Sequence, residues 1–148
     1  MDEKEFKKTI RDVNNAPCIF AKALLRRCCG CSRGEKLFIG EREAVACKSP
    51  GARQLCEDVL GQLHHKAIFA LHLPHAEVVL PHGKELKVQC GGMLGLQASL
   101  DETQIDAERV VDIYGLLTAA VAEHGSVEAL PYSQVVRGIT RFQPREKK

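Results

Sequence analysis

Residues 18–56 read CIFAKALLRRCCGCSRGEKLFIGEREAVACKSPGARQLC and hold most of the cysteines of the chain. The cysteines of this stretch are Cys18, Cys28, Cys29, Cys31, Cys47 and Cys56. The seventh, Cys90, opens the phrase CGGMLGLQ further on. Seven cysteines cannot all pair within one chain, because the number is odd. Thiols at this density indicate metal binding or thiol chemistry.

The clearest helix of the sequence begins inside this stretch. Ser49 and Pro50 form a helix start, since Ser is a common N-cap and Pro is favoured at the first helical position. Apolar residues then recur on one face as far as Leu63, which predicts a helix over 50–66.

The other predicted elements lie on both sides of this helix. They are a helix over 3–13, a helix over 18–28 that starts at Pro17 and ends at Gly30, a short strand or irregular loop over 32–43, two short strands or an extended loop over 67–80, a helix after Gly91-Gly92, a long helix over 101–124 ended by Gly125, and a helix from its Ser133 cap to Phe142. The sequence therefore predicts a mainly α fold, a single compact helical domain of five or six helices with at most a few short strands. This domain spans 1–148, with the helix in 1–14 and the tail 143–148 peripheral.

The composition excludes several classes of protein. A chain of 148 residues with 45% hydrophobic residues is long enough to bury a core. Its N-terminus is charged and lacks the apolar segment of a signal peptide. No apolar run approaches the roughly 20 residues that span a bilayer, so we expect a cytoplasmic protein without a membrane partner. A formal charge of +2 does not favour nucleic acid.

Three cysteines lie where an anionic sulfur would be stabilised. A buried thiolate is costly unless a positive group faces it, and helix N-termini supply free N–H groups and partial positive charge. Cys18 follows Pro17 at a predicted helix start, and Cys47 lies two residues before the Ser49 cap. Cys90 precedes a predicted Gly-Gly turn, whose bare amides would be free to point at sulfur.

The wide separations between the cysteines favour an iron–sulfur cluster over a single ion. A zinc site needs every sulfur about 2.3 Å from one ion, whereas a cluster presents separate iron atoms and tolerates irregular spacing. The candidate metal ligands are Cys18, Cys31, Cys47, Cys56 and Cys90, of which four would bind the cluster. Their spacing does not match the compact C-x-x-C-x-x-C run of bacterial ferredoxins.

The predicted helix over 18–28 limits the combinations within this pool. At 1.5 Å per residue its ends are about 15 Å apart, so Cys18 and Cys28 could not share a site. Cys28 and Cys29 are interpreted as neighbours of the site, although either could replace Cys31. Alternatively, the helix prediction is wrong and Cys18 begins a ligand loop.

Individual cysteines also have an ordinary structural interpretation, because free Cys is among the most buried residue types. Cys56 lies on the apolar stripe of the predicted helix over 50–66, where a core position is the usual assignment. Cys18 is equally compatible with a small apolar residue on a helix face. The functional hypothesis therefore depends on the set of cysteines and not on any one of them.

The histidines provide the main alternative metal site. His72 and His75 form an H-x-x-H, and His64, His65 and His82 are nearby in the sequence. A mixed Cys/His zinc site is therefore an alternative.

A thiol enzyme is a weaker alternative. It would use Cys90, or the C-x-x-C pair of Cys28 and Cys31. In redox enzymes such a pair opens a helix in a βαβ context, whereas here it follows a predicted helix.

The sequence thus predicts a small cytoplasmic iron–sulfur protein that acts in electron transfer, in redox sensing or as an accessory to a larger metalloenzyme. Its partner would be a redox protein or that metalloenzyme. No substrate pocket is indicated, so the sequence leans against an enzyme. A zinc-stabilised or metal-free helical interaction module is the alternative from another class.

Overall fold

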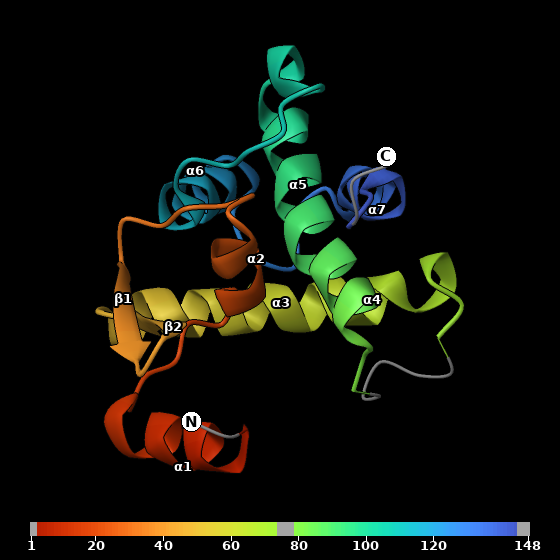
Figure 1. Ribbon diagram of the computed structural model, residues 1–148. Helices are drawn as coiled ribbons and strands as arrows, with labels where there is room; N and C mark the ends of the chain where they lie inside the picture. The colour runs from red at the N-terminus through yellow and green to blue at the C-terminus, as the bar shows by residue number, and fades with distance from the viewer. Residues whose placement is uncertain (1–2, 74–78, 145–148) are drawn as a thin grey trace.

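A computed structural model describes residues 3–73 and 79–144 of the chain (Figure 1). It is mainly helical, with a two-stranded antiparallel sheet. The elements are α1 (Glu3–Val13), α2 (Ala21–Arg26), β1 (Gly34–Ile39), β2 (Arg42–Cys47), α3 (Pro50–Ala70), α4 (His82–Leu86), a π-helical turn (Lys87–Gly91), α5 (Gly92–Leu100), a 3-10 turn (Glu102–Gln104), α6 (Ile113–His124) and α7 (Tyr132–Arg141). In the described part of the chain, no helix has the length and apolar character needed to cross a membrane.

Helix α3 runs beneath the other helices and provides one face of the core (Figure 1). The predicted start is confirmed, because the Ser49 side chain accepts a hydrogen bond from the Ala52 N–H at 3.1 Å and Pro50 occupies the first turn. Its buried face includes Val59, Leu63 and Ala67. The helix continues to Ala70, so the start of the predicted strand region 67–80 is helical, and residues 74–78 lie outside the described residues.

Helix α5 crosses α3 and packs against α7. The predicted Gly91-Gly92 turn is wrong, because both glycines have ordinary helical backbone angles and the helix runs on from the π-helical turn into α5. Close packing explains these glycines. A Cβ on Gly91 would lie 2.7 Å from the Ile139 Cα, and one on Gly95 would lie 2.8 Å from the Val135 carbonyl oxygen.

The predicted helix over 101–124 is wrong in its first half. Asp101 has an extended backbone, and its side chain accepts hydrogen bonds from Thr103, so the local polar groups favour a short turn over a continuous helix. Helix α6 begins only at Ile113. Its end at Gly125 is confirmed, where a φ of 94° suits a residue without a Cβ.

The last predicted helix is present but starts earlier. Helix α7 begins at Tyr132, so Ser133 lies inside the first turn and Pro131 holds the cap position.

The segment predicted as a strand or loop over 32–43 forms part of a β-hairpin. Strands β1 and β2 pair in antiparallel register, with Gly34 opposite Cys47 and Ile39 opposite Arg42. The turn between them contains Gly40, whose φ is 64°. Helix α1, predicted over 3–13, is confirmed and lies beside the hairpin, where Glu3 pairs with Arg42 at 2.7 Å.

Candidate functional site

Cys18 lies outside any helix, which removes the geometric limit set by the predicted helix over 18–28. Helix α2 is short because it begins only at Ala21 and ends at Arg27, which has a left-handed φ of 69°. The prediction of a helix through both Cys18 and Cys28 is therefore wrong. Cys18 belongs to the extended segment before the helix, as in the ligand-loop alternative.

This extended segment pairs with β2 and brings Cys18 beside Cys47. The Cys18 N–H donates to the Val45 carbonyl at 3.0 Å, and the Cys47 N–H donates to the Ala16 carbonyl at 2.8 Å. These two bonds flank an antiparallel bridge between Pro17 and Ala46. Residues that share such paired positions point to one face of a sheet. Cys18 and Cys47 are therefore diagonal neighbours on one face, with Cα atoms about 7–8 Å apart.

Cys31 reaches the same region from the loop before β1. The Gly34 N–H donates to the Cys31 carbonyl at 3.1 Å, and Gly34 is the register partner of Cys47. The Cys31 sulfur accepts a hydrogen bond from the Arg33 N–H at 3.4 Å. The Cys18 sulfur likewise accepts one from the Phe20 backbone. Each donor lies two residues after its cysteine, and N–H···S bonds of this kind stabilise sulfur that carries negative charge.

Cys56 completes the group from α3, which packs against β2. It is buried, as its position on the apolar stripe predicts. Burial raises the pKa of the Cys56 thiol to about 12, and the nearby sulfurs of Cys31, Cys18 and Cys47 raise it further. All four sulfurs therefore lie within electrostatic reach of one another. We call Cys18, Cys31, Cys47 and Cys56 the cysteine tetrad.

The tetrad is half-buried and has positive charge at its edge. Burial raises the pKa of the Cys18 thiol to about 11, against the opposing effects of the Phe20 hydrogen bond and the Arg53 guanidinium. Arg53 also donates to the Pro17 carbonyl at 2.8 Å, which fixes its position beside the extended segment. The Cys47 thiol donates to the Ser49 carbonyl at 3.2 Å. Cys18, Cys31 and Cys47 are all partly exposed.

A surface cleft of 410 Å³ opens beside the tetrad. It is lined by Cys18, Arg53, Glu57 and His64, among others. A wider cleft of 610 Å³, between α5 and α7, contains no cysteine. The chemistry of the cysteines therefore belongs with the smaller cleft.

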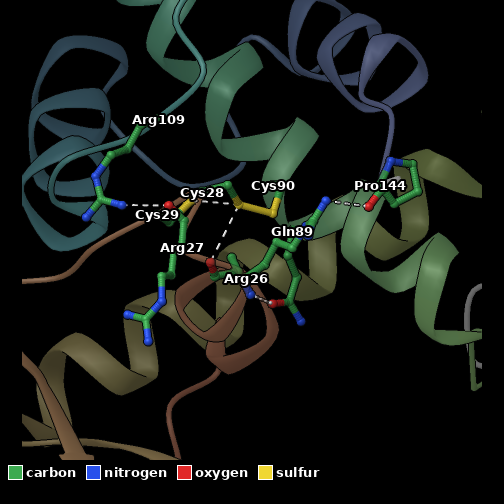
Figure 2. Close-up of a disulfide and its surroundings, with 9 residues drawn as sticks. Arg26, Arg27, Cys28, Cys29, Gln89, Cys90, Arg109 and Pro144 are labelled. Atoms are coloured by element: carbon green, nitrogen blue, oxygen red, sulfur yellow. Dashed lines mark hydrogen bonds between the residues drawn. A yellow bond between two sulfur atoms is a disulfide. The ribbon is translucent and has the colours of Figure 1, made fainter. Parts of the chain in front are cut away.

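Cys90, the fifth predicted ligand, lies apart from the tetrad in a disulfide with Cys28 (Figure 2). In this state its sulfur is not a thiolate donor, so we leave Cys90 out of the ligand set. Cys28 is paired with Cys90 and not with Cys31, which leaves the C-x-x-C hypothesis without its disulfide. Both bonded residues are buried, with exposed fractions of 8% for Cys28 and 0% for Cys90.

Cys29 lies between the disulfide and the tetrad. Its sulfur is 3.8 Å from the Cys28 sulfur. Its backbone is fixed by a bridge to Val110, reinforced by the Gly30 N–H donating to the Val110 carbonyl at 2.8 Å. Burial raises the pKa of the Cys29 thiol to about 12, opposed by Arg109 and increased by Cys18 and Cys31. Cys29 is therefore a neighbour of the site, as predicted, and it contacts both sulfur groups.

The described histidines are engaged elsewhere. His64 binds both carboxylate oxygens of Glu85, at 2.8 and 2.9 Å, and His82 lies 3.0 Å from the Lys22 amine. His75 lies outside the described residues. The structure therefore gives the mixed Cys/His zinc hypothesis no further support.

Sequence reasoning missed Asn14, which it used only as a helix stop. The Asn14 side-chain amide donates to the Val45 carbonyl at 3.2 Å, the same oxygen that accepts from the Cys18 N–H. Asn14 is buried, and its Oδ1 has no hydrogen-bond partner among the described residues. It clamps the Cys18 segment onto β2. No local sequence pattern signals this role, because the partner is distant in the chain.

No group of three or more His, Cys, Asp or Glu side chains in the described residues is spaced closely enough to hold a metal ion as it stands. Comparison of the chain with models of protein families, with characterised proteins and with solved structures finds no match. The site is therefore interpreted from its own chemistry.

Proposed function

We propose that the cysteine tetrad binds one iron–sulfur cluster, and that this small cytoplasmic protein acts in electron transfer, in redox sensing or as an accessory to a larger metalloenzyme. The observation that carries the proposal is the convergence of four free cysteines from four separate segments, while Cys28 and Cys90 are bonded to each other. Four cysteine sulfurs are the usual ligand set of such a cluster.

The surroundings of the tetrad support sulfur ligands that carry negative charge. The Phe20 and Arg33 backbone N–H groups donate to the Cys18 and Cys31 sulfurs, and Arg53 adds a nearby positive charge. A bound cluster would supply one-electron redox chemistry, with a potential tuned by these hydrogen bonds and by burial.

The partial exposure of the tetrad supports exchange with a partner protein. The 410 Å³ cleft reaches Cys18 from the surface, and its rim carries both Arg53 and Glu57. A redox protein or metalloenzyme docked there would approach the cluster without unfolding this chain.

The first test is the metal content of anaerobically purified protein. We expect brown protein with a visible charge-transfer absorption, and iron and sulfide in the ratio of a single cluster. Ser in place of Cys18, Cys31, Cys47 or Cys56 removes one ligand each, so each substitution should lower bound iron and the visible absorption. Circular dichroism would establish that each variant is folded.

Cys29→Ser is the matched control, because Cys29 is a buried cysteine next to the tetrad but outside the proposed ligand set. It should keep its iron. If Cys29→Ser loses iron while Cys31→Ser keeps it, the ligand assignment is wrong at that position. Colourless protein with one zinc per chain would overturn the cluster and support the zinc-stabilised interaction module.

A further inference from the structure

The Cys28–Cys90 disulfide is shielded from reagents in solution. It joins the residue after the C-cap of α2 to the π-helical turn before α5. Thiol–disulfide exchange requires a thiolate to reach one of the two sulfurs. Because Cys90 is fully buried and Cys28 nearly so, an external dithiol reaches this bond only after the protein opens locally.

A short line of sulfur atoms connects this disulfide with the tetrad. Cys28 and Cys29 are adjacent in sequence, and their sulfurs are 3.8 Å apart. Cys29 and Cys31 are two residues apart, so their Cα atoms are separated by at most about 7 Å. Backbone hydrogen bonds hold this segment in place: Val110 N–H to Cys28 C=O at 2.9 Å, and Ile113 N–H to Gly30 C=O at 2.9 Å.

Positive charge accompanies this line of sulfurs. Arg109 donates to the Arg27 carbonyl at 2.6 Å, and its guanidinium lies close enough to Cys29 to favour negative charge on that sulfur (Figure 2). Electrons that arrive at a buried disulfide raise its negative charge, and a nearby cation lowers the cost of that step.

We propose that the Cys28–Cys90 disulfide is a second redox centre, which receives electrons from the cluster held by the tetrad. The proposal rests on the proposed function. Each reduction of the cluster delivers one electron, and two such transfers break the S–S bond, with two protons taken from solvent, to give the Cys28 and Cys90 thiols. The cluster returns to its oxidised state after each transfer. The electrons come from a one-electron donor, and the protein thereby converts one-electron input into a stored two-electron dithiol.

The experiment uses the cluster-loaded protein with reduced methyl viologen as the one-electron donor, under anaerobic conditions. After quenching, alkylation and mass spectrometry count the free thiols at Cys28 and Cys90. We expect both residues to become alkylated in the loaded protein. The metal-free wild-type protein has the same sequence and the same disulfide, so it is the matched control, and its disulfide should stay intact over the same period.

A second variant tests the electron count. Cys28→Ser/Cys90→Ser lacks the disulfide but keeps the tetrad, so it should consume only the electron that reduces the cluster, while the wild-type protein consumes two more. The visible absorption of the cluster reports its oxidation state in both.

The outcomes separate the two proposals. If the wild-type protein binds no iron and sulfide, the proposed function fails and the relay fails with it. If the cluster assembles and is reduced but Cys28 and Cys90 stay bonded, only the relay is overturned. Equal reduction in the metal-free protein would also overturn it, because the viologen would then reach the disulfide without the cluster.

Discussion

Asp112 links the loop that carries Cys31 to the start of α6. Its carboxylate accepts a hydrogen bond from the Ser32 N–H at 2.8 Å. Burial pushes the pKa of the Asp112 carboxyl up, but the hydrogen bonds from Ser32 and the neighbouring backbone outweigh it, so the pKa lies below its ordinary value of 3.8. The ionised carboxylate therefore stabilises the fold, and with it the position of Cys31.

The charge on this carboxylate can be tested with Asp112→Asn, which keeps an oxygen acceptor. We expect a loss of about 1 kcal/mol of unfolding free energy at neutral pH. Because the folded pKa is lowered, the stabilisation is complete above the ordinary pKa of 3.8 and disappears as the pH falls through the folded value. The two proteins should therefore converge in stability only in strong acid.

Urea titrations at several pH values would measure this difference. Asp106→Asn, at an exposed position in the preceding loop, is the control and should change stability little at any pH. An unchanged gap between wild-type and Asp112→Asn at acid pH would contradict the role assigned to the charge.

Among the elements, α5 and α7 depend on glycine for their close approach. A Cβ at Gly95 would lie 2.8 Å from the Val135 carbonyl oxygen and 3.1 Å from the Val135 Cα, and the neighbouring backbone cannot move like a flexible side chain. Gly95→Ala should therefore lower the unfolding free energy by about 1–3 kcal/mol, as overpacked cores do.

Gly61→Ala is a matched control in the other long helix. Gly61 is exposed inside α3, and a Cβ there meets nothing within 4 Å. Ala is the better helix former, so this change should raise the unfolding free energy by about 0.5–1 kcal/mol. Urea midpoints, with the slope of the transition checked for constancy, would give both values. Destabilisation by both substitutions, or by neither, would refute the packing explanation.

For the whole molecule, the disulfide joins the first and second halves of the chain across a sequence separation of 62 residues. Closing a loop of this size restricts the unfolded chain, and we expect its removal to lower the unfolding free energy by roughly 2–4 kcal/mol. Thermal unfolding of Cys28→Ser/Cys90→Ser beside the oxidised wild-type protein would measure it. Cys29→Ser is the control for loss of a buried thiol alone. Similar melting temperatures for the double variant and the wild-type protein would mean that the crosslink does not stabilise the fold.

Local signals explain which features the sequence could predict. Ser49 and Pro50 determine the start of α3 through their own backbone preferences, and that prediction is confirmed. Gly91 was assigned to a turn, because its real constraint is the backbone of α7, which lies far away in the sequence. The pairing of Cys28 with Cys90 depends on the same long-range packing. The early end of α2, at a left-handed Arg27, also has no local signal, and it placed Cys18 wrongly in a helix.

The cysteine tetrad was predicted as part of a larger pool. Density and oddness of number singled out the cysteines, and spacing alone gave no means to separate Cys90 from the other four. That separation depends on β2, which pairs on one side with Gly34 and on the other with the segment before Cys18. Whether the four sulfurs bind a cluster stays a prediction.

The order of the tetrad along the chain has a consequence for biosynthesis. All four of its cysteines precede Cys90, and they lie on the hairpin, its flanking segments and the first turns of α3. A ribosome therefore releases the complete set of metal-binding thiols while the partner of Cys28 is still to be translated. N-terminal segments begin to fold during synthesis, so a metal delivered to the growing chain would meet Cys28 as a free thiol. Cluster insertion would thus come before crosslinking in the life of each molecule.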